Sequence, residues 1–177
     1  MEQKYTAKMM PKFLWLTQTA LFSAVAVILA ALESMLPDFP IPLPGVKLGL
    51  SNIATMFATQ NLGLASGLTA ALFKAIFAGL TRGGIAFIMS LAGGVLSTLV
   101  FYLFVCVKSN CFGYVGIGIS CAVMHNTAQI GIAALLTDSS VFIYYPVLLL
   151  ASLAAGAVTG IAVGIMMPVF RKIRFFW

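Results

Sequence analysis

The stretch FLWLTQTALFSAVAVILAAL, from Phe13 to Leu32, runs for 20 residues without a charged side chain. A helix of about that length spans the ~30 Å hydrocarbon core of a bilayer. The rest of the chain has the same character, because 62% of its 177 residues are hydrophobic and only 8% are charged. A soluble domain usually carries about 25% charged residues. The sequence therefore indicates an integral membrane protein.

The lysines that precede this stretch raise the question of a cleaved signal peptide. They are Lys4, Lys8 and Lys12. The apolar run is longer than the apolar segment of a typical signal peptide, and no clear small-residue cleavage site closes it. We therefore expect a retained first membrane helix.

Apolar runs separated by turn residues predict six helices in a single transmembrane domain that covers residues 1–177. The expected helices are 13–36, 48–59, 64–80, 85–107, 114–136 and 141–170, with a tight turn over 60–63. The predicted fold class is an all-α integral membrane protein, a bundle of six transmembrane helices. An even number of spans places both termini on the same side of the membrane.

The basic residues predict the orientation of the bundle. Seven share the side of the termini, namely Lys4, Lys8, Lys12, Lys108, Arg171, Lys172 and Arg174. Three lie toward the other side, namely Lys47, Lys74 and Arg82. Positively charged residues concentrate on the cytoplasmic side of membrane proteins. We therefore expect both termini to be cytoplasmic.

The three basic residues of the outer side are candidate ligand-binding residues. An ionisable side chain inside a membrane span usually faces a partner or a cavity. Two interpretations of Lys74, which lies within the third helix, are open. Either it has a structural role, in an ion pair with Glu33 or Asp138 or with its stem extended outward toward the membrane surface, or it converges with Lys47 and Arg82 on an anionic group of a ligand.

A proline-rich loop precedes the second helix. Pro40, Pro42 and Pro44 fix their own backbone angles and hold the segment extended. Ser51 and Asn52 follow at the start of the helix, where their side chains can bond to a ligand or to a neighbouring helix. The composition favours a lid or a wall of a binding site over a simple spacer.

The fifth helix carries the polar sequence HNTAQ at residues 125–129. His125 and Gln129 are four residues apart and share a face, and Asn126 lies beside them. His125 either relays a proton or hydrogen-bonds between helices. Contacts from Asn126 and Gln129 to a ligand are compatible with both roles, and all three are candidate ligand-binding residues.

Small residues indicate where helices touch in a membrane. Ala20 and Ala24 form such a pair on the first helix, where a contact within the bundle and docking of a separate membrane partner are both open. For the sixth helix we expect a contact within the bundle, made by Ser152, Gly156, Gly160 and Gly164.

Three segments resemble one known family. They are ALESMLPDFPIPLPGVKLGLSN at 31–52, SLAGGVLS at 90–97 and HNTAQ at 125–129. They resemble the heptaprenyl diphosphate synthase component I family, also called the Gx transporter family, and the resemblance covers about 20–164. Members of that family often carry arginine at the position of Lys74. A lysine keeps the charge but loses the bidentate fork of arginine.

That family is in turn similar to the S components of energy-coupling-factor (ECF) vitamin transporters. The resemblance implies a bacterial inner-membrane subunit that captures a small molecule, with the loop at 38–49 closing over it. It implies that Ala20 and Ala24 dock an energy-coupling membrane subunit driven by ATPases. It favours a flavin or another vitamin-like, anionic substrate. The alternatives are a non-catalytic membrane subunit for polyprenyl diphosphate or menaquinone synthesis, and a small channel or scaffold.

The family name includes a synthase, but the residues do not favour catalysis. Prenyl-chain elongation needs Mg²⁺ held by aspartate-rich motifs. The chain has four acidic residues, Glu2, Glu33, Asp38 and Asp138. It also lacks the phosphate-binding GxxxxGK[ST] motif. We therefore expect no enzyme activity, no catalytic residue, no metal or cofactor and no nucleic-acid partner, and we expect ATP hydrolysis to come from partner subunits.

Overall fold

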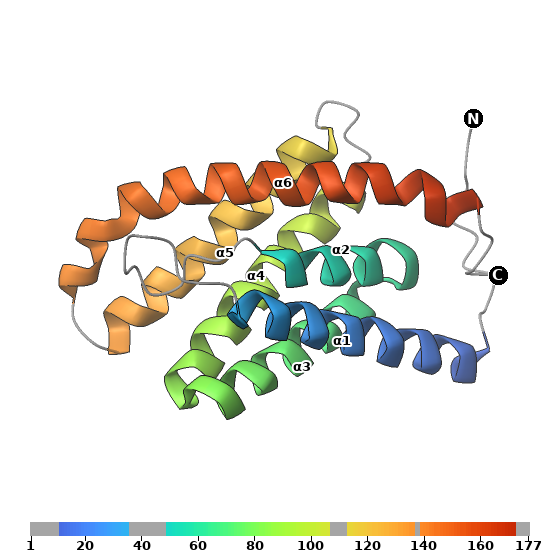
Figure 1. The fold of residues 1–177 in the computed structure, drawn as a ribbon, viewed down its shortest axis with the longest axis horizontal. Helices are drawn as coiled ribbons and strands as arrows, with labels where there is room; N and C mark the ends of the chain where they lie inside the picture. Colours follow the sequence, from blue (N-terminus) through green and yellow to red (C-terminus); the bar gives the residue numbers. More distant parts are fainter. Residues whose placement is uncertain (1–10, 36–48, 107–112, 137–138, 173–177) are drawn as a thin grey trace.

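The computed structural model describes residues 11–35, 49–106, 113–136 and 139–172, without the side chains of 139–140 and 169–172. Predictions that fall on other residues, including Lys47, Asp138 and the three prolines, lie outside the described part. Figure 1 shows six α-helices and one short 3₁₀ helix. They are α1 (Lys12–Met35), α2 (Leu50–Leu62), α3 (Leu64–Arg82), α4 (Gly84–Cys106), α5 (Tyr114–Leu136), η1 (Ser139–Tyr144) and α6 (Tyr145–Lys172). The six-helix bundle is confirmed.

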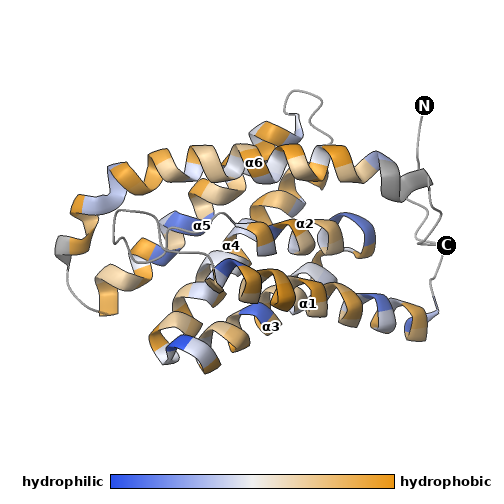
Figure 2. Cartoon of the chain, in the orientation of Figure 1, coloured by the Kyte–Doolittle hydropathy of each residue, from blue (hydrophilic) through white to orange (hydrophobic). Residues whose placement is uncertain are grey.

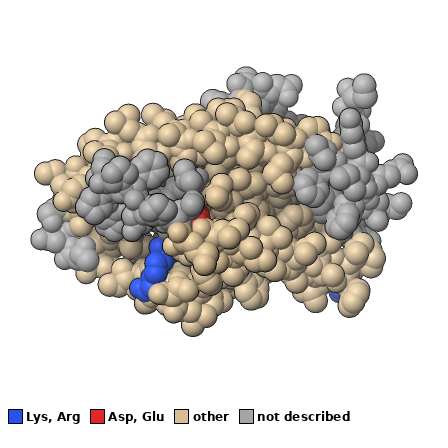
Figure 3. All heavy atoms as spheres, viewed as in Figure 1, with Lys and Arg blue, Asp and Glu red and all other residues tan. Residues whose placement is uncertain are grey.

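Most helices of the bundle have the length and composition of membrane spans. Five segments meet this description, namely α1, α3, α4, α5 and the stretch Val141–Pro168 of η1 and α6. Orange, hydrophobic residues cover these helices in Figure 2, and the described surface in Figure 3 is almost entirely uncharged. Large apolar side chains are exposed on it, among them Leu16, Ile28, Leu80, Leu103, Leu135, Leu150 and Ile165. The chain is a multi-pass membrane protein.

Helix α2 differs from the other five. Its 13 residues make a helix of about 20 Å, short of the ~30 Å that a membrane span needs. Eight of its residues are buried, from Ser51 and Asn52 to Ala54–Thr59. It contacts α1, α3, α4 and α6. The second helix is therefore a short, enclosed core element, and it is not among the five described segments that are long and apolar enough to cross a membrane.

Single glycines reverse the chain on both sides of α3. Gly63 and Gly83 have φ of 93° and 92°, a region that glycine adopts without steric cost. The turn expected over 60–63 is wrong, because α2 continues to Leu62. The indole N–H of Trp15 in α1 donates to the Leu62 carbonyl at 3.1 Å. This bond satisfies one of the carbonyls left without a partner at the end of the helix.

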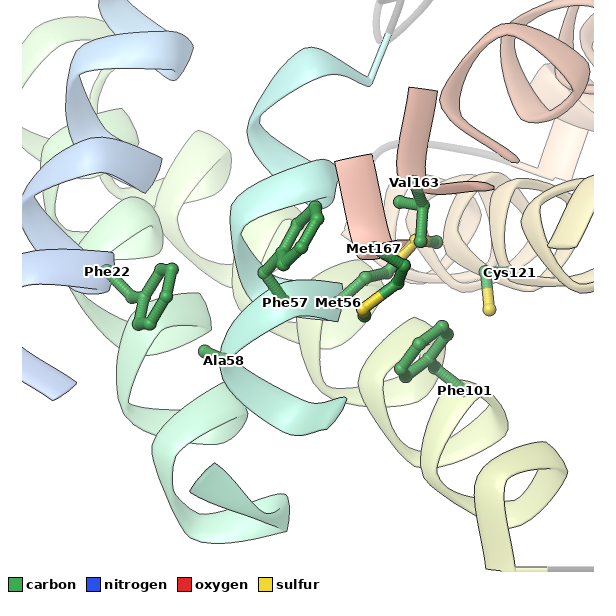
Figure 4. Close-up of a cluster of buried hydrophobic side chains, with 8 residues drawn as sticks. All are labelled: Phe22, Met56, Phe57, Ala58, Phe101, Cys121, Val163 and Met167. Atoms are coloured by element: carbon green, nitrogen blue, oxygen red, sulfur yellow. The ribbon is translucent and has the colours of Figure 1, made fainter. Parts of the chain in front are cut away.

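The hydrophobic core forms around α2 and is drawn in Figure 4. Met56 and Phe57 project from α2 toward different neighbours. Side chains from four other helices complete the cluster, namely Phe22 of α1, Phe101 of α4, Cys121 of α5, and Val163 and Met167 of α6. Because the core lies around α2, the first turn of this helix is held in a fixed place at one end of the bundle.

Helices α5 and α6 cross with their backbones in direct contact. A Cβ atom added to Gly118 would lie 2.7 Å from the Cα of Gly160 and against the carbonyl of Gly156. A Cβ on Gly156 would lie 2.5 Å from the Cα of Ile119. Only glycine permits so close an approach. The expectation that the small residues of the sixth helix make a contact within the bundle is confirmed at Gly156 and Gly160.

Candidate functional site

The candidate site lies at one end of the bundle, which we call the Glu33 end. This end is formed by the C-terminal ends of α1, α3 and α5 and the N-terminal ends of α2, α4 and α6. In Figure 1 the ends of α3 and α5 and the start of α6 lie at the left, and the end of α1 and the start of α2 lie nearer the middle. Residues that are far apart in the sequence, such as Asn52 and Lys74, are in contact in this part of the bundle.

The first turn of α2 is capped by a carboxylate from α1. Gly49, the N-cap residue, has φ of 75° and no side chain to bond the free N–H groups of the turn. The buried Glu33 side chain takes that role, because its Oε1 accepts a hydrogen bond from the Gly49 N–H. Ser51 Oγ donates to Glu33 Oε2 at 3.5 Å. A negative charge stabilises the N-terminal end of a helix, so this contact fixes the direction in which α2 begins.

The same turn is bound from the other side by an ammonium group of α3. Lys74 Nζ donates to Asn52 Oδ1 at 2.6 Å. Glu33 and Lys74 are 7% and 5% exposed, and they are the buried charged side chains of the described residues. A buried charge is costly unless it is hydrogen-bonded and compensated. Ser51 and Asn52, which are adjacent in sequence, therefore hold one buried negative and one buried positive charge.

Neutral polar pairs join α5 to α6 at this end. Asn126 Nδ2 donates to Ser152 Oγ at 2.7 Å, and Ser152 Oγ donates to the carbonyl of Leu148 at 2.6 Å. The hydroxyls of Thr127 and Tyr145 lie 3.0 Å apart. Such bonds hold helices together in a membrane, and amide and hydroxyl groups of this kind also bind uncharged ligand groups.

Two of the sequence segments noted above meet at His125. Its partly buried ring lies against α4, where a Cβ on Gly93 would be 2.9 Å from the ring atoms Cε1 and Nδ1. The next residue, Gly94, faces α3, and a Cβ there would lie 3.2 Å from the Cβ of Ala71. The two glycines of SLAGGVLS therefore make room for a polar ring on one side and for a helix on the other.

A cavity opens beside Gln129, between α4, α5, η1 and α6. It is a small pocket. Gln129 and Tyr144 supply its polar groups, and the other lining residues are apolar, namely Met89, Ile130, Ala133, Val141 and Leu148. The amide of Gln129 and the phenol of Tyr144 thus lie among apolar side chains.

The structure brings some of the predicted site residues together and separates others. Ser51, Asn52 and Lys74 form one cluster. Arg82 is exposed at the end of α3, outside that cluster. The start of α2 also approaches α6, since a Cβ on Gly49 would lie 3.5 Å from Thr159 Cγ2. The start of α2 therefore lies beside α6, the helix that carries Ser152, and α2 also contacts α1 and α3.

Sequence reasoning missed the roles of three residues. Glu33 was considered only as an ion-pair partner of Lys74, and its bond to a backbone N–H depends on the tertiary fold. Ser152 was assigned to helix contact, although its hydroxyl also bonds Asn126. Tyr144 was not singled out. The sequence offers two signals for these roles. Ser152 is a polar residue in an apolar helix, and Tyr144 stands next to a second tyrosine, Tyr145.

The outward face of α1 carries the predicted docking pair. Ala20 and Ala24 are exposed, four residues apart on one face. Gln18 and Thr19 lie on the buried side, where Thr19 Oγ1 donates to Ser66 Oγ of α3 at 3.0 Å. The polar side of α1 thus packs inside the bundle, and the side that carries Ala20 and Ala24 is exposed.

No group of three or more His, Cys, Asp or Glu residues within the described ranges is arranged to hold a metal ion. The described polar contacts of the site are hydrogen bonds, including those made by the charged groups of Glu33 and Lys74.

Comparisons with known proteins identify a family and a similar fold. A family model described as heptaprenyl diphosphate synthase component I matches residues 22–166. The solved structure of the S component of a bacterial ECF transporter has a similar fold, with a TM-score of 0.54 and 18% sequence identity. That match covers 92% of this chain and 96% of the other. No curated protein matches the chain. Both resemblances expected from the sequence are confirmed.

Proposed function

The chain belongs to the heptaprenyl diphosphate synthase component I family, and from this premise we propose that it is the substrate-binding subunit of a small-molecule transporter. The observation that carries the proposal is the polar cluster buried at the Glu33 end of a transmembrane bundle. Polar and charged groups at such depth are costly and usually mark a binding site or a transport pathway. The similar fold of an ECF transporter S component supports the same function.

The proposed binding residues come from three helices. Ser51 and Asn52 of α2 and Lys74 of α3 supply one wall. On α5, His125, Asn126 and Gln129 supply the other. Lys47 and Arg82 complete the proposed set on the outer side, where Arg82 is exposed and Lys47 lies outside the described residues.

The proposed substrate is a flavin or another vitamin-like molecule. The basic residues Lys47 and Arg82 of the outer side favour a molecule that carries an anionic group. We place the protein in the bacterial inner membrane, with both termini in the cytoplasm and the Glu33 end facing out, because seven basic residues share the opposite side. The chain itself is proposed to be non-catalytic.

The proposed partner is an energy-coupling membrane subunit that works with ATPases. Its docking surface is the exposed face of α1 around Ala20 and Ala24. Two small residues four apart let a partner helix approach closely in lipid, where helix association depends on packing.

The test is to purify the protein in mild detergent and identify co-purified small molecules by absorbance and mass spectrometry. Titration then measures the affinity for each molecule found. We expect stoichiometric, saturable binding of a vitamin-like molecule, and weaker binding by Asn52→Ala and Asn126→Ala. Val158→Ala, at an exposed position on α6, is the control. A protein that binds no such molecule contradicts the proposal.

The second candidate is a non-catalytic membrane subunit for polyprenyl diphosphate or menaquinone synthesis. The family description favours it, because it names a synthase component. Such a subunit would raise the activity of a soluble prenyltransferase partner on reconstitution and would co-purify with an isoprenoid. A transporter subunit would do neither, so the same purification separates the two functions.

A further inference from the structure

The buried charges of the candidate site cancel. Glu33 bonds to Gly49 and Ser51, and Lys74 bonds to the next residue, Asn52. One carboxylate and one ammonium are thus joined through the same turn of α2. They are the buried charged side chains of the described ranges. Their formal charges sum to zero.

This balance determines which ligand groups the interior accepts. An uncompensated charge inside the bundle is costly. A ligand anion that approached Lys74 would meet the Glu33 carboxylate at the same turn of α2. A ligand cation that approached Glu33 would meet Lys74. An uncharged group with hydrogen-bond donors and acceptors leaves the pair intact.

The other polar groups that the described residues place near this turn are uncharged. Asn126 and Ser152 form a neutral pair between α5 and α6. The cavity beside them takes its polar groups from Gln129 and Tyr144, and its other lining side chains are apolar. Arg82 is the basic residue of α3 that is exposed. The described interior therefore offers hydrogen bonds and apolar walls, and the accessible positive charge of α3 lies outside it.

Resting on the transport function proposed above, we propose that Glu33 is a specificity-determining residue of the site. It neutralises Lys74, so that the interior takes an uncharged, hydrogen-bonding part of the substrate. A phosphate or carboxylate of the substrate stays outside the interior. Lys74 then acts as a hydrogen-bonding member of a neutral pair and not as the counter-charge of a ligand anion.

Riboflavin and flavin mononucleotide are a matched pair of probes, because they differ by one phosphate. Quenching of flavin fluorescence in detergent gives the Kd of each. For Lys74→Met, we expect both affinities to fall by the same factor, so that their ratio stays within about threefold of wild type. For Glu33→Gln, which leaves Lys74 uncompensated, we expect the ratio to shift about tenfold toward the phosphorylated flavin.

The double variant Glu33→Gln/Lys74→Met restores neutrality and is expected to return the ratio to that of wild type. It also serves where a single variant fails to fold, because it leaves no uncompensated charge in the pair. Lys12→Gln, which removes an exposed charge at the opposite end of α1, is the control and keeps the wild-type ratio.

The proposal is overturned if Lys74→Met loses flavin mononucleotide binding about tenfold more than riboflavin binding. It is also overturned if Glu33→Gln or the double variant gives a ratio other than the expected one. These outcomes leave the transport function standing. A wild-type protein that binds neither flavin contradicts the proposed flavin substrate, and the inference falls with it.

Discussion

The ring of His125 on α5 lies so close to Gly93 on α4 that a single added carbon at residue 93 would sit 2.9 Å from it. We therefore expect Gly93→Ala to displace the ring and to destabilise the protein by about 1–3 kcal/mol. Thermal unfolding in detergent measures the change. Gly131→Ala on α5 is the control, because nothing lies within 4 Å of its added carbon. Equal stability of the two variants would contradict the contact.

The crossing of α5 and α6 predicts a graded series of glycine substitutions. Gly118→Ala places a carbon 2.7 Å from the Cα of Gly160, where only backbone movement can relieve the clash. We expect a loss of about 1–3 kcal/mol in the free energy of unfolding. Gly164→Ala meets Tyr114 at an ordinary 3.5 Å and is expected to have little effect. Unfolding in a denaturing detergent ranks the two, and the reverse order would contradict the crossing.

Removal of the Glu33 carboxylate is expected to loosen the first turn of α2. Glu33→Ala leaves the Gly49 N–H without its acceptor and Lys74 without its counter-charge. We expect a loss of about 1–3 kcal/mol and faster hydrogen exchange confined to residues 49–53. Ser34→Ala, at an exposed neighbour that bonds to its own helix, is the control. Unchanged exchange at these amides would show that the carboxylate does not cap the helix.

Bulky residues on the outward face of α1 are expected to separate docking from ligand binding. Ala20→Leu together with Ala24→Leu fills the exposed small-residue face without entering the core. We expect loss of co-purification with energy-coupling subunits and of uptake in cells, while ligand affinity and thermal stability stay as in wild type. Val158→Leu, exposed on α6, is the matched control. Full uptake by the double variant would rule this face out as the docking surface.

Much of the fold follows from apolar run length. Residues 114–136 are both the expected fifth helix and the observed α5. The second helix was less predictable, because Gln60 and Asn61 look like turn residues. In the structure Asn61 Nδ2 donates to the Phe57 carbonyl of its own helix at 2.9 Å. The Trp15 indole, 47 positions away in the sequence, completes the helix end. Such long-range bonds are not visible in a local pattern.

The candidate site, like the fold, was predictable from the sequence in its residue types but not in its long-range contacts. Lys74 is a site candidate in the sequence because it is a charged residue in an apolar segment. The structure shows that its side chain is buried. Its partner Asn52 was also named, but the bond between them depends on how α2 lies against α3. The capping role of Glu33 depends on the left-handed backbone of Gly49 and on the end of α1 lying beside it. Residue types therefore identified the polar members of the site, and only the fold showed how they are paired.

The single-residue turns at Gly63 and Gly83 have a consequence for how the protein enters the membrane. Helix α2 is too short to span a bilayer, and its first turn is polar. It would leave unsatisfied polar groups in lipid if it were released alone. Because one glycine joins it to α3, we expect the two helices to enter the membrane together as a hairpin, in which Lys74 of α3 can bond to Asn52. We therefore expect this part of the site to assemble as the hairpin inserts.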